Sequence, residues 1–203
     1  STGTRLLFHG SIVPARVPTS LLRALADTPE HVTLTITGYD PSRGDYLKAL
    51  ERLALDLGVE ARVHFTGTIA SRDELMRHCS RFDVGVSLLP LGSANFNERT
   101  MVGASNKPFD YLANGLALLV PDSPDWNATF VVPGYGRACD PGSVQSLTAA
   151  LRWFDENREE RRRMGERGRQ RVLGEWNYER AFAPVSRTLL GDSWRAEAGE
   201  VAR

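Results

Sequence analysis

The sequence of 203 residues predicts an α/β fold, in which a parallel β-sheet is covered by helices on both faces. Short apolar runs, each ended by a glycine or a polar turn, alternate with longer segments whose apolar residues recur at helical spacing. Strands that alternate with helices in this way form parallel sheets with both faces buried. Every candidate motif also follows a predicted strand, and such sheets bind ligands at the carboxyl ends of their strands.

The sequence pattern of the first half of the chain predicts four strands and three helices. The strands are expected at 6–10, 32–37, 62–65 and 83–89, and the helices at 19–26, 45–57 and 71–79. Ser71 followed three residues later by Glu74 forms a capping box at the start of the third helix. Thr19 or Ser20 is expected to cap the first helix, and Gly58 to end the second.

The second half begins with a long polar loop over 90–105 and a short helix. Because proline is tolerated only in the first turn of a helix, Pro108 predicts a start near Asn106 or Lys107, and Gly115 predicts the end. The remaining predicted elements are a strand at 116–120, a turn at 122–127, a weak strand at 137–139 and helices at 143–157, 159–176 and 178–190.

Composition excludes several classes of protein. The formal net charge is zero, whereas nucleic-acid and membrane-surface binders carry a basic excess. Cys79 and Cys139 form no metal-binding or disulfide pattern, and no apolar run is long enough to cross a membrane. We therefore expect a cytoplasmic protein with one domain over 5–190, a linker remnant at 1–4 and a polar tail at 191–203. The abrupt start suggests that the chain was cut, either in the design of an expressed fragment or by omission of a preceding domain.

The helix that opens near residue 106 carries the strongest functional signal. Unpaired amides in its first turn, with Lys107 beside them, form a natural anion site. Asp110 lies one turn further along, where its carboxylate could accept hydrogen bonds from neighbouring hydroxyls. A phosphate site next to a diol site describes a nucleotide. The alternative is that Lys107 and Asp110 form only an ion pair at a helix start, and that His9, at the end of the first strand, is structural.

Six segments in order resemble a known family: 7–16, 33–38, 63–69, 74–86, 105–120 and 175–179. Together they are similar to the C-terminal, donor-nucleotide-binding domain of the retaining GT-B-fold glycosyltransferases called family 4 or group 1. This resemblance implies a Rossmann-like sheet and transfer of a sugar, with retention, from a UDP- or GDP-linked donor. It implies no obligatory metal, and a saccharide or lipid-linked saccharide acceptor bound by an N-terminal domain that this chain lacks. Polysaccharide biosynthesis and a location peripheral to the inner membrane would follow for the full-length protein.

The resemblance also assigns site residues. The donor site would consist of Gly10, Ser11, Arg16, Ile69, Ala104, Ser105, Asn106, Lys107 and Asp110. Gly10 would let the backbone approach the diphosphate, and Arg16 and Lys107 would neutralise it and serve as the catalytic cations. Asp110 would bind the ribose hydroxyls, and the backbone of Ile69 would contact the base. The alternative for Arg16 is an ordinary surface residue.

Three positions depart from the family pattern. Ser11 stands where the family usually has an arginine, and its hydroxyl or amide could still contact a phosphate. Arg16 replaces a lysine, and Val102 replaces the first of two paired acids, of which Asp110 is the second. The amides near 104–106 would add the helix dipole. The isolated chain is expected to bind nucleotide without transferring sugar. Two alternatives are a degenerate GT-B domain that serves as an interaction module and a nucleotide-sugar epimerase on the same scaffold.

Overall fold

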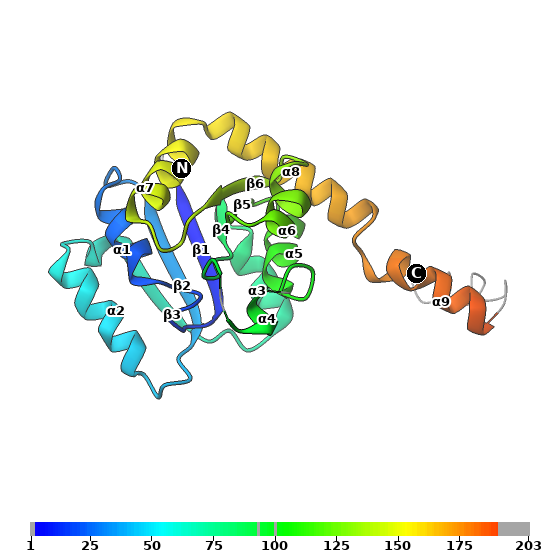
Figure 1. Cartoon of the computed structure of the whole chain (residues 1–203), viewed down its shortest axis with the longest axis horizontal. Coiled ribbons are helices and arrows are strands. Elements are labelled where there is room, and N and C mark those ends of the chain that lie inside the picture. The colour runs from blue at the N-terminus through cyan, green and yellow to red at the C-terminus, as the bar shows by residue number, and fades with distance from the viewer. Residues whose placement is uncertain (1–2, 93, 100, 191–203) are drawn as a thin grey trace. The chain divides into compact units, whose positions relative to one another are not determined.

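A computed structural model describes residues 3–92, 94–99 and 101–190. Its centre is a parallel sheet of six strands in the order β3-β2-β1-β4-β5-β6 (Figure 1). The chain adds β2 and β3 on one side of β1 and then crosses over to add β4, β5 and β6 on the other side. The strand order therefore reverses direction between the adjacent strands β1 and β4. In open α/β sheets a ligand crevice forms at this point.

The strands are β1 (Arg5–Ser11), β2 (Thr33–Tyr39), β3 (Val63–Gly67), β4 (Val84–Val86), β5 (Ala117–Pro121) and β6 (Gly136–Cys139). The helices are α1 (Thr19–Ala26), α2 (Asp45–Asp56), α3 (Arg72–Cys79), α4 (Phe96–Arg99), α5 (Asn106–Ala113), α6 (Pro124–Trp126), α7 (Val144–Glu156), α8 (Arg158–Gly174) and α9 (Tyr178–Leu190), with a 3₁₀ turn at Glu60–Arg62 and a π-helical turn at Asn127–Val131. The prediction of a Rossmann-like parallel sheet is confirmed.

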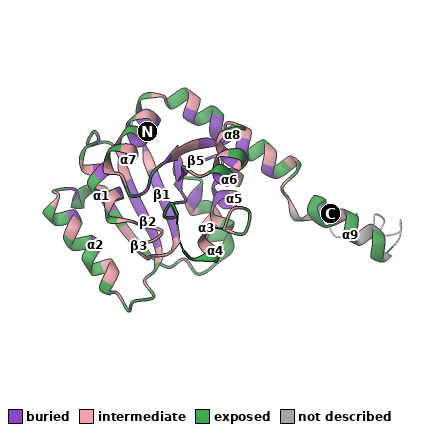
Figure 2. Ribbon diagram, viewed as in Figure 1, coloured by how far each residue is buried: buried purple, intermediate pink, exposed green. Residues whose placement is uncertain are grey.

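Helices cover both faces of the sheet. Helix α1 packs against α2 and α7 on one side, whereas α3 packs against α5 on the other (Figure 1). The central strands are buried along most of their length, and the helices are exposed on their outward sides (Figure 2). This burial explains why the central strands β1, β4 and β5 are mostly apolar and the helices are amphipathic.

Two glycines bring β1 and β2 together at their carboxyl ends. Gly10 is paired with Gly38, and both have positive φ angles, of 123° and 144°. A Cβ atom at Gly38 would lie 1.8 Å from the carbonyl oxygen of Gly10. No other residue could occupy position 38 without separating the strands, which end at the site described below.

Most predicted elements agree with the structure to within two residues, and the Ser71–Glu74 cap is confirmed because the Ser71 hydroxyl accepts a hydrogen bond from the Glu74 amide at 3.2 Å. The predicted caps of α1 are wrong. The N-cap is Pro18, which makes no side-chain cap hydrogen bond, and the Ser20 hydroxyl donates to the carbonyl of Pro141.

The strand predicted over 83–89 is shorter, because regular pairing stops at Val86 where the chain turns toward the polar loop. That loop contains the short helix α4. The turn predicted at 122–127 extends through α6 into the π-helical turn. The predicted polar tail after Gly191 lies outside the described residues.

The chain divides into two compact units, one through Arg169 and one from Gln170. The first holds the whole sheet. The second begins with the end of α8 and contains α9, and within it the Arg171 guanidinium lies 5.3 Å from the centre of the Trp176 ring. Among the described residues, no helix has the length and apolar character needed to cross a membrane.

Candidate functional site

A cleft with a volume of about 370 Å³ opens where the carboxyl end of β1 faces the start of α5. It brings together eight of the nine predicted site residues: Gly10, Ser11, Arg16, Ala104, Ser105, Asn106, Lys107 and Asp110. His9, Tyr39, Arg72, Leu75 and Met101 complete its lining. Segments that are distant in sequence therefore meet at the switch point of the sheet.

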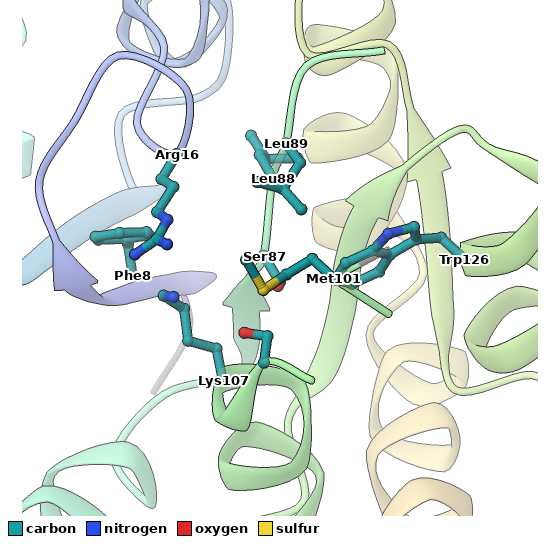
Figure 3. Close-up of a pocket in the computed structure, with 9 residues that line it drawn as sticks. Phe8, Arg16, Ser87, Leu88, Leu89, Met101, Lys107 and Trp126 are labelled. Atoms are coloured by element: carbon teal, nitrogen blue, oxygen red, sulfur yellow. The ribbon is translucent and has the colours of Figure 1, made fainter. Parts of the chain in front are cut away.

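Arg16 and Lys107 line both this cleft and a small adjoining pocket, in which their side chains point toward each other (Figure 3). Arg16 lies in the turn after β1, where its amide donates to the Val13 carbonyl at 2.9 Å. Lys107 projects from the first turn of α5, with its Nζ 5.9 Å from the centre of the Phe8 ring. Burial, and secondly the positive charge of Arg16, lower the pKa of Lys107 to about 8. Two cations held this close create a strong site for an anion.

Gly10 is required beneath Lys107. Its φ of 123° is rarely adopted by other residues, and a Cβ atom there would lie 2.8 Å from Cε of Lys107. The aliphatic part of the lysine therefore packs directly on the backbone of Gly10. This contact limits the conformations open to the lysine side chain.

The start of α5 agrees with prediction, but not all of its amides are free. Ser105 is the N-cap, and its side chain makes no cap hydrogen bond. The amides of Ala104 and Ser105 donate to the Met101 carbonyl at 3.0 and 3.1 Å. These two amides are therefore bonded within the loop in this structure, and both residues line the cleft. The amide of Asn106, at the first helical position, remains in a place suited to that role.

Asp110 lies at the bottom of the cleft in a bidentate ion pair. Its two carboxylate oxygens accept hydrogen bonds from Nη1 and Nη2 of Arg72 at 2.9 and 2.5 Å. The Asp110 side chain is only 3% exposed, whereas that of Arg72 is 61% exposed. The guanidinium therefore covers the carboxylate, and hydrogen bonding to Asp110 raises the pKa of Arg72.

His9 is a buried neutral imidazole next to this pair. Its Nε2 lies 3.4 Å from Oδ2 of Asp110 and has no hydrogen-bond partner among the described residues. Burial outweighs the attraction of Asp110 and lowers the pKa of His9 to about 4. The Tyr111 hydroxyl accepts a hydrogen bond from the His9 amide at 2.9 Å and donates one to the Val86 carbonyl at 3.3 Å. Tyr111 thereby links α5 to both β1 and β4.

Ile69, the ninth predicted residue, lines a second hollow of about 170 Å³. This hollow shares His9, Gly10, Tyr39 and Leu75 with the first, so the two adjoin at the end of β1. Thr37, Gly38 and Thr68 complete it. A ligand longer than a diphosphate could therefore extend from the cationic cleft toward Ile69.

The sequence did not indicate Arg72, Tyr39 or Met101 as site residues. Arg72 is 38 residues from Asp110 and is one of many arginines in the chain, so no local pattern marks the pair. Tyr39 ends β2, and its Oη accepts a hydrogen bond from the Ser11 hydroxyl at 3.0 Å. Its place at a strand end beside Gly38 is the signal that could have identified it.

The family model of glycosyl transferases group 1 matches residues 1–171. The chain belongs to the group 1 glycosyltransferases. The match extends over the sheet, the cleft and most of α8. Membership of this family confirms the resemblance inferred from the six sequence segments.

Curated proteins and solved structures are similar to this chain. A GDP-mannose-dependent alpha-(1-6)-phosphatidylinositol monomannoside mannosyltransferase from Mycobacterium tuberculosis is 28% identical over 184 residues, which are 89% of this chain and 46% of the relative. The C-terminal domain of LpcC, a group 1 glycosyl transferase from Francisella tularensis, superimposes with a TM-score of 0.70 at 17% identity and covers 86% of this chain and 87% of that one.

Anabaena HepE in complex with UDP-glucose superimposes with a TM-score of 0.67 at 19% identity, over 82% of this chain and 43% of that one. At such identities the structural matches establish the fold, which is the C-terminal half of the GT-B architecture. The chain spans about half the length of the curated group 1 relatives that it matches.

Proposed function

We propose that this chain is the donor-binding half of a retaining glycosyltransferase that uses a nucleoside-diphosphate sugar. One observation carries the proposal: Arg16 and Lys107, from segments 91 positions apart, face each other across one cleft at the switch point of the sheet. Such a pair matches the charge and size of a diphosphate. The names of the relatives agree, since one uses GDP-mannose and another was crystallised with UDP-glucose.

The two cations would act mainly on the leaving group. When the bond between the sugar and the diphosphate breaks, negative charge accumulates on the departing nucleotide. Arg16 and Lys107 already lie where that charge develops, so they stabilise it without rearrangement. Lys107 in particular loses part of its own hydration on burial, and a bound diphosphate would restore a favourable environment for its charge.

The remaining predicted residues fit the other parts of a nucleotide donor. Gly10, Ser11 and the Asn106 amide lie along the proposed diphosphate, and Ala104 and Ser105 form the wall of the cleft. The hollow at Ile69 would take the base, where backbone groups make the contacts. Backbone recognition does not by itself select between uracil and guanine, so UDP and GDP donors are both retained in the proposal.

Activity would require a second domain. We propose that an N-terminal domain binds a saccharide or lipid-linked saccharide acceptor and closes over the cleft, and that transfer needs no obligatory metal. Val102, in place of the first acid of the family pair, leaves the donor sugar without that contact. The isolated chain would bind nucleotide without appreciable transfer.

Calorimetric titration of the 203-residue chain with UDP, GDP and ADP tests the binding proposal. We expect at least one diphosphate to bind, and Lys107→Ala to weaken it by about 10- to 100-fold, because a hydrogen bond to a charged group contributes about 1.5–3 kcal/mol. Lys48→Ala is the matched control, since Lys48 is the only other lysine and lies exposed on α2. Failure of all three nucleotides to bind at millimolar concentration contradicts the proposal.

The catalytic role is tested in the full-length protein. There Lys107→Ala should remove about 2–4 kcal/mol of transition-state stabilisation, as loss of other preorganised charge-stabilising groups does. An unchanged kcat/KM would instead favour a domain that serves as an interaction module.

A further inference from the structure

The loop after β1 contributes less charge to the cleft than the family pattern implies. Ser11 occupies the position of the usual arginine, and its hydroxyl donates a hydrogen bond to Tyr39 Oη at 3.0 Å. Of the loop residues that line the cleft, only Arg16 carries a charge. A diphosphate bound there would lack one cation on the side of the cleft nearest Ser11.

Arg72, at the first position of α3, lines the same cleft as Ser11, Arg16 and Lys107. Its guanidinium is fixed in orientation because both Nη atoms donate to Asp110, which is buried at the bottom of the cleft. An arginine has five N–H donors, so this pairing leaves others for a ligand. Asp110 holds the guanidinium in one orientation. The exposed part of Arg72 is therefore the group that a ligand would meet in this part of the cleft.

The same geometry limits what Asp110 can do. Both of its oxygens are bonded to Arg72, and its side chain is almost fully buried. Each carboxylate oxygen keeps a second lone pair, so a ribose diol could reach Asp110 only beside the guanidinium that covers most of it. In the cleft as it stands, Arg72 presents far more surface to a ligand than Asp110 does.

The charge of the cleft fits a polyanion. Arg16, Arg72 and Lys107 are three cations, and Asp110 is the one acid among the residues that line it. The imidazole of His9 is neutral, since its pKa is about 4. The sum is about two positive charges at neutral pH, which suits a nucleoside diphosphate and not a neutral sugar.

We propose that Arg72 is the third cation of the donor site, replacing the arginine absent at position 11, and that Asp110 is a positioning residue that holds Arg72 against the diphosphate. This inference rests on the proposed nucleotide-binding function. It gives Asp110 a role exerted through Arg72, beside the ribose contact that the family resemblance implies.

Titration of Arg72→Gln with UDP and GDP tests the role of Arg72. We expect affinity for the diphosphate to fall by about 10- to 100-fold, as for loss of other charge-assisted hydrogen bonds. Arg77→Gln removes the same charge from an exposed position on the same helix and should change affinity less than about twofold, because exposed charges outside the site are screened by salt. Adding Ser11→Arg to Arg72→Gln should restore part of the loss.

A second titration separates the two roles of Asp110. If Asp110 only positions Arg72, Asp110→Asn weakens a nucleoside diphosphate and its 2′,3′-dideoxy analogue by the same factor. A carboxylate that binds the diol would make the loss specific to the ribose form. Thermal unfolding of each variant shows whether it is folded, and Arg72→Lys, which keeps the charge, provides a milder substitution.

The outcomes distinguish this inference from the proposed function. If the unsubstituted chain binds no diphosphate, both fail. If it binds, and Lys107→Ala weakens binding while Arg72→Gln does not, the donor site stands and the role of Arg72 is overturned. Loss in both variants, with no change in Arg77→Gln, supports three cations acting on one ligand.

Discussion

The side chain of Lys107 rests on the backbone of Gly10, with so little space that a Cβ atom at Gly10 would lie 2.8 Å from the lysine Cε. The two residues come from distant segments of the chain: Gly10 lies at the end of β1 and Lys107 at the start of helix α5. Their contact places the ammonium group opposite Arg16. The absence of a side chain at Gly10 thus leaves room for a charged side chain from another segment.

Gly10→Ala should therefore impair both folding and binding. A residue forced into an unusual φ costs about 1–3 kcal/mol of stability, and displacement of Lys107 should weaken a nucleoside diphosphate to nearly the extent that Lys107→Ala does. Chemical denaturation and calorimetry measure the two effects. Gly58→Ala is the control, because Gly58 also has a positive φ, of 67°, but has nothing within 4 Å of the added Cβ. If Gly10→Ala retains the original affinity, the contact does not position the lysine.

The affinity for a diphosphate should fall above about pH 8. Lys107 has a pKa of about 8 in the free protein, and binding requires its protonated form. As pH rises through this value, affinity falls by up to about tenfold per pH unit. The fall ends at the pKa of Lys107 in the complex, which the bound diphosphate raises. Calorimetry between pH 7 and 9 measures the slope. Lys107→Arg should remove it, because a guanidinium stays protonated; an equal slope in that variant would assign the titration to another group.

His9 should make the fold sensitive to acid. Its pKa of about 4 in the folded state lies below the ordinary value of 6.5, so the unfolded chain binds more protons between these two values. The free energy of unfolding must then fall as pH decreases from 6.5 toward 4, by about 2 kcal/mol between pH 7 and pH 5 from this group alone. Chemical denaturation of His9→Gln at pH 7 and pH 5 should show a loss of unfolding free energy that is smaller by that amount. Equal losses in both proteins would indicate that His9 is not buried as a neutral group.

A polar cluster near the amino end of β1 should contribute strongly to stability. Asp155 accepts hydrogen bonds from the Thr4 hydroxyl and from His31 Nε2, both at 2.7 Å, and Arg161 donates to Thr4 Oγ1. Because Thr4 and Arg161 are buried, Asp155→Ala should cost about 2–4 kcal/mol of unfolding free energy.

A matched control for this cluster is Asp56→Ala. It removes an ion pair with Arg52 of 3.1 Å, in which both side chains are more than half exposed. Such pairs contribute about 0–1 kcal/mol, so urea denaturation should show little change. Similar losses in Asp155→Ala and Asp56→Ala would mean that burial of the cluster adds nothing.

The fold was predictable because its signals are local. An N-cap at Ser71, a proline in the first turn of α5 and a glycine after it each act within a few residues, and each agrees with the structure. The predicted cap of α1 was wrong because Pro18 already ends the preceding turn, which leaves Ser20 free to bond with a distant carbonyl.

The site was predictable only in part, since its assembly depends on contacts between distant segments. The family pattern identified Arg16, Lys107 and Asp110, but not the partner of Asp110. The pairing with Arg72 arises because α3 and α5 pack side by side on one face of the sheet. The bonding of the Ala104 and Ser105 amides to Met101 likewise depends on how the loop before α5 turns.

The switch in strand order between β1 and β4 has a mechanical consequence. Ligand contacts at this point would add a further connection between the part of the chain that builds β1 to β3 and the part that builds β4 to β6, which within the sheet are joined by one short strand pair and outside it by the packing of α1 on α7. Binding of a ligand in the cleft would then slow hydrogen exchange of backbone amides in both parts of the sheet together.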